Sequence, residues 1–304
     1  MTEARIAVAN APCSWGATDD FPPDGDALGY AQVLDEMALA GYAGTELGDW
    51  GFLPTDPATL RAELSRRNLA LAGAFVPVRL SDPSAHAAGE ELAVRTALLL
   101  AEGATGQGPP CLVLADDANP ARVSVAGHAT PEHALTDGQW RIVAQGAERI
   151  ARAVRERSGL RTAFHHHAGT HVETPDEVAK LMELTDPALL GLCLDTGHYT
   201  YGGGDALEAA RRYGDRIWHV HAKDCDRDIF VSALADGWDY SRAVCSRLFC
   251  ELGRGVVDLP AVISELRRRG YRGWVVVEDE VAPGTGVPIE SARHDRAFLQ
   301  GLGI

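Results

Sequence analysis

Short apolar runs rich in β-forming residues alternate with helical patterns along the whole chain. Eight such runs occur, at residues 5–10, 42–47, 69–76, 110–116, 161–167, 189–195, 216–224 and 273–279. Helical patterns follow them, covering about 27–41, 57–68, 86–103, 137–158, 175–185, 204–213, 259–270 and 286–300. This alternation predicts βαβ units built around a parallel sheet.

Capping signals at the expected helix ends support this division. Thr174 precedes Pro175, and Glu177 stands three residues after the threonine, which is the capping-box pattern of a helix start. Gly41 and Gly270 stand where helices should end. Eight units in 304 residues predict one (β/α)8 TIM barrel domain over 1–304, although an open doubly wound sheet remains an alternative.

Two connections are longer than the rest. The segment 225–256 is long enough to cover an active site, and the Pro/Gly/Asp-rich segment 16–27 is a smaller candidate for such a cover. Loops that follow barrel strands carry the active site in this fold, so both segments are expected near it.

Composition excludes several classes of partner. The net charge of −15 repels phosphate backbones and anionic headgroups, so neither nucleic acid nor a membrane surface is expected as a partner. No basic segment followed by a long apolar run opens the chain, and no stretch approaches the roughly 18 apolar residues of a membrane span. Six scattered cysteines without CxxC spacing read as free thiols. We expect a soluble cytoplasmic protein, with homo-oligomerisation left open.

Polar side chains with metal-binding chemistry gather at the ends of the apolar runs. They are Glu46, Asp116, His165, His167, Asp195, His198, His221, Asp224 and Glu278. The carboxyl ends of barrel strands meet on one face, so these groups should converge on one pocket. Since side chains alternate along a strand, His165 and His167 should point inward, with His166 packed behind the sheet and His171 at the surface.

Asp195, His221 and Glu278 form the best metal-binding set. Two carboxylates and an imidazole suit Mn²⁺, Co²⁺, Fe²⁺ or Zn²⁺ better than Ca²⁺. Each residue also has an ordinary structural explanation: Asp195 could cap a turn, and His221 could be a hydrogen-bonded core histidine. Glu46 could bind substrate or pair with an arginine. The expectation for Asp279 and Glu280 is that they are solvated neighbours of the site.

Several motifs resemble a known family. The D-x-x-H of 195–198, the H-x-H-x-x-D of 219–224 and the terminal V-V-E resemble the metal-site segments of the xylose isomerase-like (β/α)8 barrels, which are sugar isomerases and epimerases. Within that family, NAPCSWG, residues 40–64, FHHHAGT and VVVEDE are most similar to the inosose dehydratases, which dehydrate 2-keto-myo-inositol.

The resemblance implies a divalent metal, most consistent with Mn²⁺ or Co²⁺, on Asp195, His221 and Glu278. Relatives usually supply a fourth ligand, a glutamate, where this chain has HHH. His165 is the preferred replacement, while His167, or three protein ligands and more water, remain alternatives. The family's substrate-gripping arginine would fall on Arg227.

The remaining candidates complete a predicted active site. His167, His198, Lys223 and Glu46 are the candidates for moving protons, with acid and base unassigned, and Trp15 and His219 join Arg227 as candidate substrate contacts.

The expected reaction removes water β to the ketone of a keto-polyol. A metal-dependent sugar isomerase or epimerase is the nearest alternative. A sugar-binding barrel without catalysis is another. The net charge argues against an endonuclease acting at abasic sites.

Overall fold

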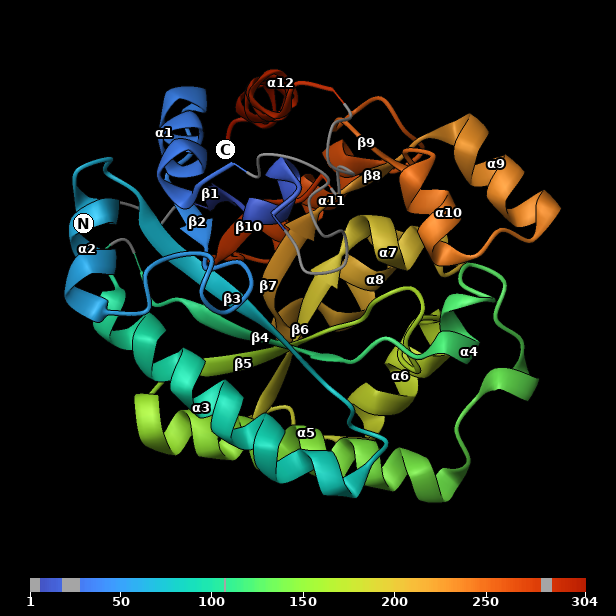
Figure 1. The fold of residues 1–304 in the computed structure, drawn as a ribbon. Coiled ribbons are helices and arrows are strands. Elements are labelled where there is room, and N and C mark those ends of the chain that lie inside the picture. Colours follow the sequence, from blue (N-terminus) through green and yellow to red (C-terminus); the bar gives the residue numbers. More distant parts are fainter. Residues whose placement is uncertain (1–5, 18–27, 107, 280–285) are drawn as a thin grey trace.

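Eight parallel strands close into a barrel in the computed structural model, which describes residues 6–17, 28–106, 108–279 and 286–304 (Figure 1). Their order around the barrel is β1-β10-β7-β6-β5-β4-β3-β2. The strands are β1 (Ala7–Asn10), β2 (Gly44–Glu46), β3 (Ala70–Val78), β4 (Cys111–Asp116), β5 (Arg161–His165), β6 (Leu190–Asp195), β7 (Ile217–Ala222) and β10 (Trp274–Val277). Because β1 pairs with both β2 and β10, the sheet is closed, and the predicted TIM barrel is confirmed over the open sheet.

The eight predicted helices are all present, with ends within a few residues of the expected ones. They are α1 (Tyr30–Ala40), α2 (Pro57–Ser65), α3 (His86–Gly103), α5 (Asp137–Ser158), α6 (Pro175–Leu184), α8 (Ala206–Tyr213), α11 (Leu259–Arg268) and α12 (Pro288–Gly301). The expected capping box is present, since the Thr174 side chain accepts from Glu177 N–H and the Glu177 side chain accepts from Thr174 N–H. These helices surround the barrel, with α3 and α5 packed side by side (Figure 1).

Shorter elements that the sequence pattern did not predict fill the connections. They are the helices α4 (Pro120–Val123), α7 (Thr196–Tyr201), α9 (Arg227–Asp236) and α10 (Tyr240–Cys245), the strands β8 (Asp224–Cys225) and β9 (Phe249–Cys250), and the 3-10 turns η1 (Pro12–Trp15), η2 (Pro83–Ala85), η3 (Pro131–His133) and η4 (Gly214–Arg216).

The segment 225–256 is folded rather than a long loop. It contains α9, α10 and the antiparallel β8–β9 pair, which lie together at one side of the barrel (Figure 1). Cys225, Val244, Leu248 and Phe249 from this segment form an apolar cluster that also includes Tyr201 of α7. The segment therefore packs against the carboxyl-terminal side of the barrel. The other expected cover, 16–27, lies from residue 18 onward outside the described residues.

Asp224 holds this segment in place. Its carboxylate accepts backbone N–H groups from four residues, Cys225, Gly253, Gly255 and Val257, at 2.9–3.0 Å. The expectation that Asp224 belongs to the converging ligands was wrong, because its acceptor capacity is used by the backbone of the 250–257 loop.

Two irregularities in strand register shape the barrel interior. Between β6 and β7 the pairing passes from Leu192–Ile217 to Cys193–His219, so Trp218 is an extra residue. Between β2 and β3 it passes from Thr45–Leu71 to Glu46–Gly73, so Ala72 is extra. Such bulges change where the following side chains point.

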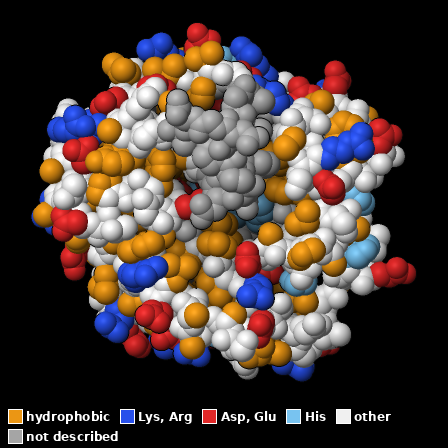
Figure 2. All heavy atoms as spheres, viewed as in Figure 1, with side chains coloured by type: hydrophobic (Ala, Val, Ile, Leu, Met, Phe, Trp, Pro, Cys, Tyr) orange, Lys and Arg blue, Asp and Glu red, His pale blue; other side chains and the backbone are white. Residues whose placement is uncertain are grey.

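On the face seen in Figure 2, basic side chains are dispersed among acidic ones rather than gathered into a groove. Nucleic-acid-binding surfaces usually have a basic stripe. Among the helices in the described ranges, none is both long and apolar enough for a membrane span.

Candidate metal centre

Four buried side chains converge at the carboxyl ends of four neighbouring strands. They are His165 at the end of β5, Asp195 at the end of β6, His221 in β7 and Glu278 directly after β10, and one ligand atom from each lies within 4.8 Å of the others. The structure therefore brings together the three predicted ligands and the fourth candidate, His165.

The distances within this cluster suit a shared cation. His165 Nε2 lies 3.4 Å from Asp195 Oδ2, and His221 Nδ1 lies 3.8 Å from the same oxygen and 3.2 Å from Glu278 Oε2. Asp195 Oδ1 instead accepts the N–H of His198 at 2.7 Å, so this carboxylate also caps α7. His221 Nδ1 is buried and has no hydrogen-bond partner, which fits an atom that coordinates a metal.

Electrostatics keeps the two carboxylates ionised. Burial alone would raise the pKa of Glu278, but the neighbouring His221 and Lys223 outweigh burial and lower it. Burial would also raise the pKa of Asp195, yet Lys223 and His198 hold it well below its usual range. Ionised oxygens and imidazole nitrogens are what a borderline divalent ion needs.

Glu46 orients His221 from the layer of the barrel interior beneath the metal cluster. Its Oε1 lies 2.7 Å from His219 Nε2 and 3.2 Å from His221 Nε2, and it pairs with these histidines rather than with an arginine. Burial raises the pKa of Glu46, but His221 and His219 more than offset this and lower it. Because a carboxylate only accepts, His221 must hold its proton on Nε2, which leaves the lone pair of Nδ1 for the cluster.

Gly73 leaves room for the pairing of Glu46 with His219. The Cβ of an alanine at Gly73 would lie 3.0 Å from Glu46 Oε1 and 3.4 Å from His219 Cε1. The bulge at Ala72 brings Gly73 opposite Glu46. The absence of a side chain at Gly73 therefore allows a buried carboxylate and imidazole to meet inside the barrel.

Lys223 and His198 lie beside the cluster. The Lys223 side chain is fully buried, with Nζ 3.1 Å from His198 Nε2, 3.2 Å from Glu278 Oε2 and 3.6 Å from Asp195 Oδ2. Its ammonium also lies 4.6 Å from the centroid of the Phe249 ring. A buried amine among carboxylates and an imidazole is a group that can exchange protons with a substrate.

His167 is the most accessible of the predicted catalytic histidines. Its ring centroid is 3.9 Å from that of His198, and its Nδ1 donates to the carbonyl oxygen of Ala168 at 2.7 Å. The hydroxyl of Tyr240 approaches Nε2 at 3.5 Å. Tyr240 and Phe249 were missed by sequence reasoning, and the only signal for them was that 225–256 should lie near the site.

Three further expectations concern side chains beside the strand ends. His166 is packed behind the sheet, as predicted, with Nε2 accepting Asp195 N–H and its ring against Tyr199. The surface position expected for His171 was wrong, because it is half-buried and its Nδ1 is 3.0 Å from Asp116 Oδ2. This pairing also shows that Asp116 holds a loop instead of joining the metal cluster.

Asp279 is not solvated, contrary to expectation. It is 4% exposed, and its N–H donates to Ser14 Oγ at 2.9 Å. Burial raises its pKa even though it shares a hydrogen bond with the buried Asp295. Glu280, expected to be a similar neighbour, lies outside the described residues.

The predicted substrate contacts occupy three different settings. Trp15 is buried in η1 after β1 and donates from Nε1 to Glu36 at 2.7 Å. Arg227 is exposed at the first turn of α9. His219 lies one layer below the metal cluster. Their roles in substrate binding stay predictions.

Residues 34–302 match the family described as xylose isomerase-like TIM barrel. The chain belongs to this family. It is 36% identical over 306 residues to the inosose dehydratase of Geobacillus kaustophilus, covering 98% of this chain and 94% of that protein.

Solved structures with a similar fold agree with the barrel architecture. The probable 3-DHS dehydratase AsbF of Bacillus anthracis superposes with a TM-score of 0.70 at 12% identity, covering 97% of this chain and 99% of that one. The D-allulose 3-epimerase of Methylomonas sp. superposes with a TM-score of 0.68 at 18% identity, covering 98% of both chains. At these identities the likeness concerns the fold alone.

Proposed function

We propose that this protein is a metal-dependent dehydratase of a keto-polyol, with 2-keto-myo-inositol as its substrate. The observation that carries the proposal is the buried cluster of His165, Asp195, His221 and Glu278 beside Lys223, in a chain 36% identical to an inosose dehydratase over almost its whole length. Elimination of water next to a carbonyl needs an electrophile, a base and an acid, and each has a candidate in or beside this cluster.

The four clustered side chains would hold the divalent cation. Two imidazoles and two carboxylates favour Mn²⁺ or Co²⁺, with Zn²⁺ or Fe²⁺ as alternatives. When bound, the cation supplies a Lewis acid that polarises the substrate carbonyl. Glu46 would act as a positioning residue, because it fixes the proton of His221 on Nε2.

His167 is the proposed base. Because Nδ1 donates to the Ala168 carbonyl, a neutral His167 holds its lone pair on Nε2, the atom that would accept the proton from the carbon next to the ketone.

Lys223 is the proposed acid, acting with His198. Two carboxylates within 4 Å favour its ammonium form, so it has a proton to deliver to the departing hydroxyl group. The 3.1 Å separation of Lys223 Nζ and His198 Nε2 allows the pair to exchange protons.

The test is an assay of the purified protein with 2-keto-myo-inositol, stripped of metal and then reloaded with Mn²⁺ or Co²⁺. We expect a rise in ultraviolet absorbance from a conjugated dione product, loss of one water by mass spectrometry, and no reaction without metal. An unchanged substrate would refute the proposal. A product of unchanged mass would instead assign the isomerase or epimerase chemistry.

Variants separate the proton-transfer roles from folding. His167→Gln and Lys223→Met should each lower kcat by about 10²- to 10⁴-fold while the protein still binds metal. His171→Asn is the matched control, since it changes a half-buried histidine of the same loop that pairs with Asp116. A loss of kcat in the control equal to that in His167→Gln would show that the loop, rather than the imidazole of His167, is responsible.

A further inference from the structure

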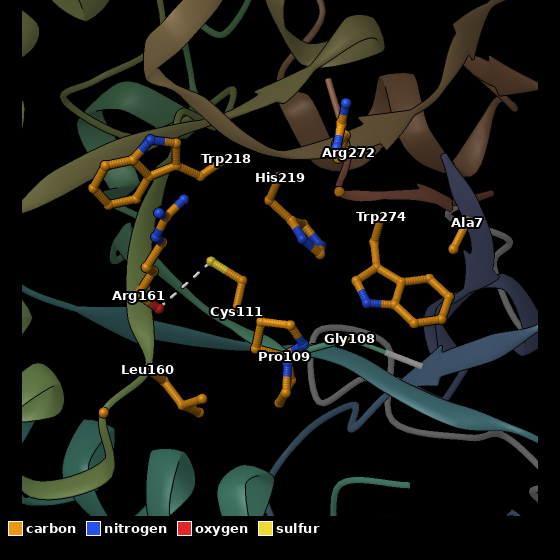
Figure 3. Close-up of a pocket in the computed structure, with 13 residues that line it drawn as sticks. Ala7, Gly108, Pro109, Cys111, Leu160, Arg161, Trp218, His219, Arg272 and Trp274 are labelled. Atoms are coloured by element: carbon orange, nitrogen blue, oxygen red, sulfur yellow. Dashed lines mark hydrogen bonds between the residues drawn. The ribbon is translucent and has the colours of Figure 1, made fainter. Parts of the chain in front are cut away.

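A cavity opens at the mouth of the barrel opposite the metal cluster. It measures about 350 Å³ and is lined by residues at or just before the beginnings of β1, β4, β5, β7 and β10 (Figure 3). Since all barrel strands are parallel, their beginnings lie on the side away from the metal cluster. Small-molecule sites usually measure about 300–1,000 Å³, so this cavity suits a small ligand.

Two indole rings stand on either side of this cavity. Figure 3 places Trp218 and Trp274 across it from one another. Trp218 is the extra residue of the β6–β7 bulge. A Cβ at Gly191 would lie 2.2 Å from the Trp218 ring, and a Cβ at Gly44 would lie 2.8 Å from the Trp274 ring. The two glycines and the bulge are therefore what allow both indoles to sit at this mouth, where they favour a flat ligand.

His219 points into the space between the indoles and has an unsatisfied nitrogen (Figure 3). The residue is fully buried, and its Nδ1 has no hydrogen-bond partner. Its Nε2 is 2.7 Å from Glu46 Oε1, and because a carboxylate only accepts, Nε2 carries the proton. With the proton on Nε2, Nδ1 has no donor facing it among the described residues, so a ligand that presents a hydroxyl group here would satisfy this atom.

The rim of the cavity carries positive charge. Arg161 and Arg272 line it and are both exposed, and the Arg161 guanidinium lies 5.1 Å from the centroid of the Trp218 ring. The lining within the described part of the chain includes no Asp or Glu, although the whole chain has a net charge of −15. Two guanidinium groups, with no carboxylate among the lining residues that the structure describes, favour a carboxylate ligand.

We propose that this cavity binds a small aromatic carboxylate that bears a hydroxyl group. The ring lies between Trp218 and Trp274, the hydroxyl donates to His219 Nδ1, and the carboxylate faces Arg161 and Arg272. His219 is linked to the metal cluster through Glu46, but the proposed ligand contacts no metal-cluster residue, so its binding can be measured without the dehydratase activity.

The probe is 4-hydroxybenzoate, titrated into the full-length protein by isothermal titration calorimetry. We expect saturable binding at one site. Benzoate, which lacks the donor for His219, should bind about 10-fold more weakly. The double variant Arg161→Ala/Arg272→Ala should also weaken binding by about 10-fold or more. Arg141→Ala, which removes an exposed arginine of α5, is the matched control and should leave the affinity unchanged.

Three results would overturn the proposal. One is the absence of saturable binding up to about 10 mM ligand, a concentration far above a useful affinity. Another is equal affinity of the double variant and the Arg141→Ala control. The third is a crystal structure of the complex with the ligand at the carboxyl ends of the strands. A failure of the dehydratase assay alone would leave this site unaffected.

Discussion

Glu46→Gln tests whether a carboxylate below the metal cluster controls metal binding. Glutamine keeps the shape of the side chain and one acceptor oxygen, so His219 and His221 keep a hydrogen-bond partner. What disappears is the negative charge that strengthens both bonds. If Glu46 works by fixing the proton of His221 on Nε2, the variant should bind metal less tightly while remaining folded.

The size of the effect follows from the two bonds of Glu46. Hydrogen bonds to a charged acceptor are worth about 1.5–3 kcal/mol and neutral ones about 1 kcal/mol, so each bond loses about 1 kcal/mol. In the free energy of unfolding, much of this lost hydrogen-bond energy is offset, because the glutamine variant no longer buries a charged group. Metal affinity has no such offset, and loss of an outer partner of a ligating histidine typically costs about 10- to 100-fold.

The assay is competition of the protein with a chelator for Mn²⁺ or Co²⁺, alongside thermal unfolding. Glu177→Gln is the matched control, because it neutralises another buried carboxylate, one that pairs with Arg122 at 2.8 Å. We expect that control to lower stability and leave metal affinity unchanged. The reasoning about Glu46 is refuted if Glu46→Gln holds metal within about threefold of the unchanged protein, since its expected loss is at least about 10-fold.

Three further predictions concern stability. Burial and a neighbouring aspartate raise the pKa of Asp295 to about 10, so the folded state holds a proton that the unfolded chain releases above about pH 4. The free energy of unfolding therefore falls as pH rises from about 4 to 10, by up to about 1.4 kcal/mol per pH unit. Asp295→Asn should flatten this decline, which urea titrations at several pH values would measure. Gly191→Ala should lower the free energy of unfolding by about 1–3 kcal/mol in the same titrations, because the added Cβ meets the Trp218 ring. Gly301→Ala, whose Cβ would have nothing within 4 Å, should be neutral or stabilising. Equal effects of the two variants would contradict the packing argument. Asp224→Ala leaves four backbone donors without their acceptor and should cost about 2–4 kcal/mol, with faster amide exchange confined to Cys225 and 250–257. Unchanged exchange in 250–257 would show that the loop does not need this carboxylate.

The metal cluster could be predicted from sequence because two regularities combine. Apolar runs mark the strands, and a parallel barrel gathers the ends of those strands on one face. His165, Asp195, His221 and Glu278 each end or follow such a run, so no knowledge of packing was needed to bring them together.

The layer beneath the cluster could not be predicted in the same way. Glu46 and His219 meet where Ala72 is an extra residue of β3, the strand next to that of Glu46, and Trp218 is an extra residue of β7, the strand of His219. A bulge changes register by one residue without altering the hydrophobic pattern enough to be recognised. The contact between these residues, and the cavity below it, depend on that register.

The errors at Asp279 and Asp224 concern the outer face of the barrel. Alternation along a strand places Asp279 on the face opposite Glu278 and Asp224 on the face opposite Lys223. Asp279 was expected in solvent and Asp224 among the converging ligands, and both expectations failed because the outer face of a barrel strand is covered by helices and returning loops. Asp279 meets Asp295 of α12 there, and Asp224 meets the 250–257 backbone. A polar residue that alternates out of a barrel site therefore needs a buried partner, and the search for that partner belongs in the neighbouring helix or loop.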